Sequence, residues 1–450
     1  MLRRNFLKYT SAIAAMALLP LEANAAPYTG PLWVFVQASG GWDPTSLCDP
    51  KGYALVSDGE EGFTQEDNPM NKCFKTEEIK TSSRGVKYPD FLAENNLTTA
   101  NADEANLVYE EFFENNAEDL LVINGIDTQT NGHSTGQRYM MSGRLAEGYP
   151  ALSALIAGIH LPSSPLAFIT AGGYDETDGV VAGTRLSNID AINELAFVNL
   201  YDTNDEDETI PYQHKSVFAR INKAKDARVD RLKNQQKLDS IKDLVSQYKL
   251  AHSGSNELSK LVEYLPEDIN THPDRNNRVF AQGRFAMAGF KAGLTASVNI
   301  QSGGFDTHGN HDANQVPSLT RVLKGVNLLR QEAKNQGISD RVIFVIGSEF
   351  GRTPGYNGGN GKDHWSVSSM MFMGKGIRGG RVLGKSTNRH SAMSVNPKTL
   401  NPLSDPEEGT KITYAHINIA LRKLAGIETN PLIVQYYPLD SNLDSLNLFG

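Results

Sequence analysis

The sequence predicts an α/β protein with a mostly parallel sheet sandwiched by helices. Three observations support this fold class. Short apolar, β-branched runs alternate with segments in which apolar residues recur every three or four positions. Glycine-rich loops follow several of the apolar runs, as turns at strand ends require. The chain has 450 residues, of which 39% are hydrophobic and 21% charged, values that are ordinary for a globular protein with a sizeable core.

The first 25 residues predict an export signal. An arginine pair at 3–4 precedes a modest apolar stretch that ends at Leu19, and Ala23-Asn24-Ala25 forms a small-residue cleavage site. The pattern resembles a twin-arginine signal, with a chance arginine pair in an ordinary secretory signal as the alternative. The apolar stretch is too short to span a membrane. We therefore expect a periplasmic or secreted protein, exported by the twin-arginine pathway, with no transmembrane segment in the mature chain.

Six apolar runs predict the strands of the sheet. They lie at residues 32–37, 120–124, 166–170, 295–300, 342–346 and 368–373. Helical periodicity predicts helices over residues 151–159, 279–291, 317–336 and 413–424. The succession from 295 to 346 is strand, loop, helix, strand, which is a βαβ unit and implies parallel strands.

The mature chain, residues 26–450, is expected to form a single α/β domain with a helical insertion at 203–275. Within the insertion, Val217, Ile221 and Ala224 recur at helical spacing. The many charged residues between them indicate a solvated face rather than a binding surface. The segment carries no obvious catalytic set.

The cysteine count and the net charge narrow the functional class. Cys48 and Cys73 are the only two cysteines, and an oxidising compartment would permit a disulfide between them, with two unpaired thiols as the alternative. The net charge is −9, and a nucleic-acid partner would require a basic surface. We therefore expect no nucleic acid among the partners.

Candidate functional residues fall just after predicted strands or at helix starts. They are Asp43, His133, Asp306, His308, Glu349, Asp363, His364 and, on the last helix, His416. In an open α/β sheet, ligands bind outside the carboxyl ends of the strands, so these side chains are expected to share one site. Mixed Asp and His ligands suit zinc first, with manganese, calcium or magnesium as alternatives. Arg352 or Arg138 would hold the anionic oxygens of a substrate.

Each candidate also has a structural interpretation. Asp306 could cap a turn, Asp43 beside Pro44 could start one, and Glu349 could pair with Arg352. His308, His364 and His416 could be hydrogen-bonding histidines of the core. His311 is expected to be a spectator of the nearby pair.

The motifs that carry these residues resemble a known family. They are GGWD at 40–43, GHSTGQRYMMSG at 132–143, GGFDTH at 303–308, SEFGRT at 348–353 and KDHW at 362–365. With the export signal, they resemble a bacterial family of twin-arginine-exported proteins of unknown function that is distantly similar to sulfatases and alkaline phosphatases. The resemblance covers most of the mature chain, and the helical insertion contributes little to it.

The resemblance implies a metal-binding alkaline phosphatase/sulfatase-like fold. Asp43 matches the metal-binding Asp that ends the first strand of that superfamily. Asp306 and His308 resemble the ligands of one metal, completed by His416, and Asp363 and His364 resemble the ligands of a second metal. The superfamily nucleophile would lie at residues 133–135, where Ser134 or Thr135 could attack or orient water. No cysteine precedes YMMSGR, which disfavours a formylglycine sulfatase, and His133 could itself be a ligand there.

These observations lead to two hypotheses. The first is an exported metal-dependent hydrolase of phosphate or sulfate esters, whose substrate is an anionic small molecule or a glycan ester. In this hypothesis Ser134, Thr135, Arg352 and Glu349 supply the catalytic groups. The alternative is a non-catalytic secreted envelope protein that keeps the fold for binding or assembly, and a metal-free protein is a third, weaker possibility.

Overall fold

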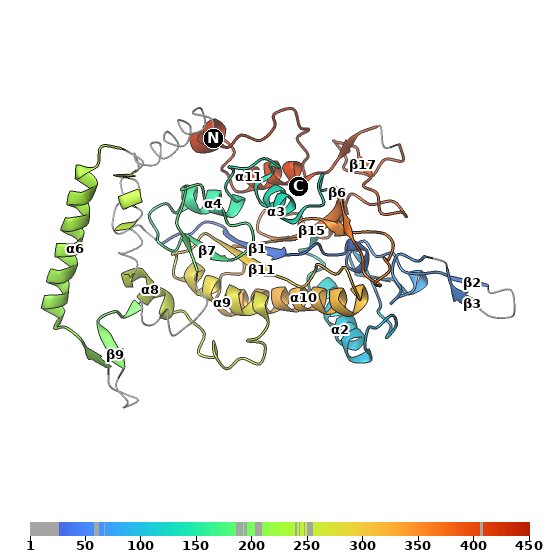
Figure 1. The fold of residues 1–450 in the computed structure, drawn as a ribbon, viewed down its shortest axis with the longest axis horizontal. Helices are drawn as coiled ribbons and strands as arrows, with labels where there is room; N and C mark the ends of the chain where they lie inside the picture. Colours follow the sequence, from blue (N-terminus) through green and yellow to red (C-terminus); the bar gives the residue numbers. More distant parts are fainter. Residues whose placement is uncertain are drawn as a thin grey trace.

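The fold is that of a computed structural model (Figure 1). The structure describes residues 27–450 except 58–62, 67, 186–191, 193–195, 203–208, 239–240, 243, 247, 250–254 and 406–407. The predicted export signal at 1–25 lies outside these residues.

The centre of the molecule is an eight-stranded sheet. In spatial order its strands are β16 (Arg381–Leu383), β6 (Leu121–Asp127), β15 (Val367–Gly374), β12 (Val342–Gly347), β1 (Leu32–Ala38), β11 (Ser297–Ser302), β7 (Phe168–Ala171) and β8 (Gly183–Thr184). Only β15 runs against its neighbours in this sheet, because it pairs antiparallel with both β12 and β6 while the other pairings are parallel. The predicted mostly parallel sheet is confirmed.

The central strand explains why the sheet is covered on both faces. Every residue of β1 is buried. Because side chains alternate along a strand, Leu32, Val34 and Val36 enter one hydrophobic cluster and Trp33 and Phe35 enter the other. A continuous apolar run of this kind is typical of a parallel strand between two layers of helices.

Six helices form the two covering layers (Figure 1). One face carries α2 (Thr99–Asn115), α9 (Arg278–Lys291) and α10 (His311–Asn335), and the other carries α3 (His133–Ser142), α4 (Leu152–His160) and α11 (Tyr414–Leu424). Together, β11, α10 and β12 form the predicted βαβ unit with parallel strands. The helix α10 begins at His311, six residues before the predicted start, and includes Pro317.

The remaining elements are short or lie outside the layers. They are the strand pairs β2 (Leu55–Ser57) with β3 (Phe63–Gln65), β4 (Lys80–Thr81) with β5 (Lys87–Tyr88), β9 (Leu200–Asp202) with β10 (Thr209–Pro211), β13 (Gly351–Arg352) with β14 (His364–Trp365), and β17 (Ser394–Val395) with β18 (Thr410–Lys411), the helices α6 (Lys215–Gln235), α8 (Ser255–Val262) and α12 (Pro431–Tyr436), and the 3₁₀ turns Pro44–Ser46 and Thr76–Glu78. Among the described residues, none of the helices combines the length and hydropathy that a membrane crossing requires.

The segment predicted as a helical insertion contains α6 and α8. Figure 1 shows α6 standing apart from the layered body, and none of its residues is buried. In contrast, Leu261 of α8 is fully buried in the core. The segment therefore has one helix that contacts the body and one that projects from it, while residues 203–208 lie outside the described part of the chain.

The two cysteines do not form the expected disulfide. Cys48 and Cys73 are both buried and free. The Cys48 thiol lies 3.5 Å from the amide oxygen of Asn124, and burial raises the pKa of both thiols. The expectation of a covalent staple is therefore wrong, and hydrophobic packing holds this region to the sheet.

Candidate metal centre

The predicted site residues come together at one edge of the sheet. His133 begins α3 after β6, Asp306 and His308 follow β11, and Glu349 follows β12. These three strands are parallel, so their carboxyl ends meet at the same edge. His364 precedes β15, whose opposite direction places its start at that edge as well.

Three side-chain atoms form a small triangle at this edge. Nε2 of His308 and Nε2 of His364 are 3.0 Å apart, and they lie 3.1 Å and 3.2 Å from Oδ1 of Asp306. Nε2 of His133 lies 3.4 Å from the other oxygen of Asp306. A tetrahedral zinc ion with ligands at about 2.0–2.1 Å has ligand-to-ligand edges of about 3.3–3.4 Å. The triangle therefore has nearly the size of one face of a tetrahedral metal site.

The outer nitrogens of these three histidines are all held by oxygen acceptors. Nδ1 of His133 lies 2.9 Å from a carboxylate oxygen of Glu349, and Nδ1 of His308 lies 2.7 Å from a carboxylate oxygen of Asp363. Nδ1 of His364 lies 2.7 Å from the backbone oxygen of Asn131. Since a carboxylate or carbonyl oxygen only accepts, these contacts favour the tautomer with the proton on Nδ1, in which the Nε2 lone pair faces the centre and can bind an ion. With no ion bound, the contacts of Nε2 with the Asp306 carboxylate suit the tautomer with the proton on Nε2.

This arrangement is the pattern expected of metal ligands. Nε2 atoms 3.0 Å apart beside a carboxylate are held together by a proton on one ring, or by a cation that all of them bind. Imidazole nitrogen and carboxylate oxygen form a donor set that fits zinc and other first-row divalent ions. His133, Asp306 and His364 offer ligand atoms that all lie within 4.8 Å of one another, and Nε2 of His308 lies 3.0 Å from that of His364. By donor type these residues fit a metal ion.

Glu349 orients His133 and does not pair with Arg352. Its side chain is only 1% exposed. The same oxygen that faces His133 accepts the backbone N–H of Gly40 at 2.8 Å, and the other accepts the Ser348 hydroxyl at 3.1 Å. The hydrogen bond to Glu349 raises the pKa of His133. Glu349 is thus placed to orient the His133 ring and to increase its basicity, as the outer partners of metal-binding histidines do.

Arg352 holds Asp306 in place. The guanidinium is fully buried and donates to the backbone oxygens of Gly40, Gly41 and Lys362, and to Oδ1 of Asp306 at 2.8 Å. Burial would raise the pKa of Asp306, but the hydrogen bonds from Arg352 and His364 lower it to about 2. With its donors directed to these partners, Arg352 is placed to orient Asp306 and is not exposed to hold a substrate anion, the role predicted above.

Asp43 lies in a separate buried network. Its carboxylate contacts Nζ of Lys362 at 2.6 Å, Nε2 of His311 at 3.1 Å and the backbone N–H of Thr45 at 2.8 Å. Burial opposes ionisation, but Lys362 and His311 hold the pKa of Asp43 far below its usual range. An ammonium group thus occupies the position beside Asp43 that a metal was predicted to take. Sequence reasoning overlooked Lys362, although it directly precedes Asp363 and His364.

The structure does not bring His416 to the triangle. It lies in the first turn of α11, where its Nδ1 accepts the backbone N–H of Thr413 at 3.2 Å in a capping box. Burial lowers its pKa. His416 is therefore placed to start a helix.

The predicted nucleophiles lie beside the triangle without a bond to it. Ser134 is exposed and Thr135 half-buried in the first turn of α3. Within the described part of the chain, neither hydroxyl hydrogen-bonds to the triangle. It is His133, one residue earlier, whose side chain reaches Asp306.

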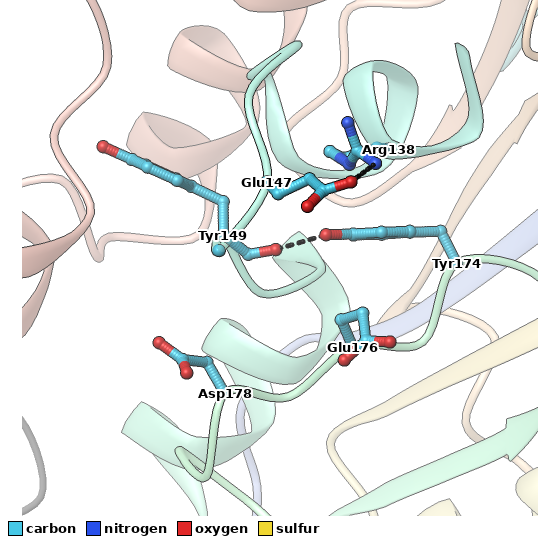
Figure 2. A pocket seen from close by; sticks show the side chains of 7 residues that line it. Arg138, Glu147, Tyr149, Tyr174, Glu176 and Asp178 are labelled. Carbon is cyan, nitrogen blue, oxygen red and sulfur yellow. Dashed lines mark hydrogen bonds and ion pairs between the residues drawn. The ribbon is translucent and has the colours of Figure 1, made fainter. Parts of the chain in front are cut away.

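A pocket of about 290 Å³ lies further along α3 (Figure 2). Arg138 in this pocket donates to Glu147 at 3.2 Å and to the backbone oxygen of Leu145 at 2.7 Å. Figure 2 also shows the hydroxyl of Tyr174 donating to the backbone oxygen of Tyr149. The side chains that line the pocket are Arg138, Glu147, Tyr149, Tyr174, Glu176 and Asp178. Three carboxylates and one paired guanidinium do not suit an anion, so Arg138 is not an evident substitute for Arg352.

Comparison with known proteins confirms the resemblance to a family of unknown function. A family model described as "Protein of unknown function (DUF1501)" matches residues 183–405, which is just under half of the chain. No curated protein matches the chain. The matched part includes Asp306, His308, Glu349, Asp363 and His364 but not His133.

Several solved structures are similar to the chain. A 2-O GAG sulfatase has a TM-score of 0.33 and 11% identity, with 89% of this chain and 72% of that chain covered. A sulfatase from Pseudoalteromonas sp. has a TM-score of 0.34 and 10% identity, covering 96% and 74%. A phosphonate monoester hydrolase of Agrobacterium radiobacter has a TM-score of 0.32 and 10% identity, covering 88% and 74%. Because these scores and identities are low, these structures carry no argument about function.

Proposed function

We propose that the protein is an exported, metal-dependent hydrolase of phosphate or sulfate esters. The observation that carries the proposal is the convergence of the Nε2 atoms of His308 and His364 on Asp306, with His133 beside them. The outer acceptors that fix these rings support a metal, because such partners raise ligand basicity. The ester class follows from the predicted resemblance.

In this proposal, His133, Asp306, His308 and His364 hold one divalent ion, with zinc as the first choice. A bound ion would polarise an ester oxygen and lower the pKa of a coordinated water. The chain's own residues prepare the site: Arg352 keeps Asp306 ionised and oriented. Glu349, Asp363 and the backbone oxygen of Asn131 keep the protons of the three rings on Nδ1.

The exposed Ser134 is the group placed to contact a substrate beside the ion. It lies in the first turn of α3 directly after His133. Free backbone N–H groups at a helix start attract anions, which would favour an ester group there. Ser134 would orient water or the ester and Thr135 would assist, since neither has a general base bonded to it in the described residues.

A substrate and metal panel tests the activity. Purified protein is incubated with zinc, manganese or calcium and with aryl phosphate and aryl sulfate esters. The proposal predicts turnover that a chelator abolishes and that His364→Ala removes without loss of fold, judged by circular dichroism. An absence of turnover with every metal and ester would contradict it.

The second candidate is a secreted envelope protein that binds metal but catalyses nothing. The burial of Arg352 and the lack of a base at Ser134 favour it, because an ester hydrolase usually needs an exposed cation and an activated nucleophile. Stoichiometric metal together with no activity, and no change in phenotype for Ser134→Ala with Thr135→Ala, would select this candidate.

Export is tested separately. Replacing the arginine pair, Arg3→Lys with Arg4→Lys, should retain the protein in the cytoplasm if the twin-arginine pathway carries it. Fractionation followed by immunoblotting measures the distribution. Unchanged export of the variant would indicate an ordinary secretory signal.

A further inference from the structure

A large cleft lies between the early part of the chain and residues 382–389, and its lining includes none of the candidate metal ligands. It has a volume of about 1100 Å³, slightly above the usual range of about 300–1,000 Å³ for small-molecule pockets. The described residues that line it belong to segments 48–54, 76–87, 354–355 and 382–389, together with Glu66, Asn68, Met70 and Asn124. A cleft of this size, walled by several segments, suits an extended ligand better than a small one.

Three cations of the cleft have no acidic partner within the described part of the chain. Lys87, Lys385 and Arg389 line it and are exposed. Among the described residues, none of the three forms an ion pair. Because the chain as a whole has a net charge of −9, three unpaired cations in one cleft depart from the general surface and would attract an anion.

The carboxylates of the cleft are already engaged. Asp49 lies 3.0 Å from Nζ of Lys51 and also accepts a hydrogen bond from Ser386. Glu66 accepts the backbone N–H of Ala54 at 3.1 Å. Lys51 offsets Asp49, whereas Glu66 keeps its negative charge and offsets one of the three remaining cations. The described charged lining of four cations and two carboxylates still favours an anion.

The uncharged lining indicates the class of anion. Asn68, Thr76, Asn124 and Asn388 offer amide and hydroxyl groups that can hydrogen-bond to sugar hydroxyls. No aromatic side chain is among the described residues that line the cleft. Single-stranded nucleic acid is bound largely by stacking its bases on aromatic rings, so the lining disfavours it. We infer that this cleft binds a linear polysaccharide with acidic substituents.

The cleft borders the loop that carries two site residues. Pro354 and Gly355 form part of its wall. The preceding residue, Thr353, forms two hydrogen bonds with the backbone of Asp363. Its N–H donates to the backbone oxygen of Asp363 at 2.9 Å, and its hydroxyl accepts from the backbone N–H of Asp363 at 3.0 Å. A bound chain would thus lie against the loop that ends in His364. Binding is a property of the cleft and does not require the metal ion.

The test compares two triple variants that remove the same charge. In the cleft variant, Lys87→Gln, Lys385→Gln and Arg389→Gln remove the free cations. In the control variant, Lys375→Gln, Lys398→Gln and Lys411→Gln remove three exposed lysines that are not among the cleft-lining residues. Fluorescence anisotropy measures binding of labelled dextran sulfate and labelled polygalacturonate, with unlabelled neutral dextran as competitor.

The expected result is that one of the two polyanions binds and that the cleft variant weakens binding by at least about tenfold, since three contacts of about 0.5 kcal/mol each give this factor. Which of the two probes binds tells whether the cleft prefers sulfate or carboxylate substituents. Binding of either probe should weaken as the salt concentration rises. Three outcomes would overturn the inference: neither polyanion binds, the control variant loses as much affinity, or labelled single-stranded poly-dT binds the cleft as tightly. Metal content and ester turnover of the wild type and of the cleft variant are measured in parallel. Their failure in the wild type would count against the hydrolase and leave the binding result valid.

Discussion

At the scale of single residues, the candidate site depends on groups that never touch the proposed ion. The carboxylates of Glu349 and Asp363 and one backbone oxygen favour the proton on Nδ1 of each histidine, which leaves Nε2 free to bind an ion. A ligand set without these partners would have rings free to turn and protonate at Nε2. The outer partners are therefore as informative about metal binding as the ligands themselves.

Changing Glu349→Gln should weaken metal binding by about 10–100-fold, because the neutral amide no longer fixes and polarises the His133 ring. Competition with a fluorescent zinc chelator measures the affinity. The matched control is Glu147→Gln, which removes the same charge from a side chain that is 87% exposed. Equal affinities for the Glu349 variant and the wild type would show that His133 is not a ligand.

His390 predicts how the stability of the protein depends on pH. Burial lowers its pKa from 6.5 to about 4, with Lys51 and Lys362 acting in the same direction and Asp43 and Asp49 opposing. Between these two values the unfolded chain takes up a proton that the folded chain does not. His390 therefore contributes stability that is complete above about pH 6.5 and is lost as the pH falls toward 4, by up to about 3 kcal/mol.

The variant His390→Asn removes this titration, and asparagine tolerates the left-handed backbone at this position, where φ is 56°. Urea midpoints measured from pH 7 to pH 4.5 should fall less steeply for the variant than for the wild type. Parallel curves would contradict the assignment.

At the scale of elements, α3 must pack closely on the loop after β12 for His133 to reach Asp306. A β-carbon added at Gly136 would lie 2.9 Å from the backbone oxygen of Glu349, closer than real contacts allow. Glycine at position 136 therefore lets α3 approach the backbone of Glu349, whose carboxylate contacts His133 at the start of the helix. The position of α3, and with it His133, depends on this contact.

Gly136→Ala should push α3 outward and lower metal affinity while the protein remains folded. Isothermal titration with zinc and far-UV circular dichroism measure the two properties. Gly303→Ala is the control, because a β-carbon there meets nothing within 4 Å although the residue lies close to Asp306 in the sequence. Similar affinities for both variants would show that the close approach of α3 is not needed.

The loop between β13 and β14 is held by the buried pair of Asp43 and Lys362. Lys362→Met leaves the carboxylate buried with only neutral partners and should destabilise the protein by about 3–5 kcal/mol. The urea midpoint measures the loss. Adding Asp43→Asn to this variant should recover part of the lost stability, because no unpaired charge then remains buried. A double variant as unstable as Lys362→Met alone would contradict a direct charge pairing between Asp43 and Lys362.

At the scale of the whole molecule, the pattern of apolar runs was enough to predict six of the eight strands of the sheet, without the short edge strands β8 and β16, and the edge at which the site lies. Strand positions depend on local periodicity, and parallel strands bring their carboxyl ends together whatever their order. The clustering of Asp306, His308 and His364 therefore followed from the motifs. The separation of these residues from Asp43 could not be predicted from the motifs. It depends on a contact between Asp43 and Lys362, which lie more than three hundred residues apart in the sequence.

The roles of the charged residues were harder to predict than their location. The sequence did not decide among several roles for Glu349. Its hydrogen bond with His133 forms only because α3 packs closely against the backbone of Glu349. Arg352 was expected to face a substrate, but three backbone oxygens and Asp306 surround its guanidinium. A motif fixes which groups arrive at a site, whereas burial decides which of them face solvent.

Metal uptake tests the central claim most directly. The protein, stripped with a chelator and then equilibrated with zinc, is separated from free ions and analysed by mass spectrometry, alongside the variant His308→Ala with His364→Ala. The account predicts one zinc ion per chain in the wild type and none in the variant, since the triangle and His133 together hold a single ion. A wild type that takes up no zinc, or a variant that takes up as much as the wild type, would contradict it.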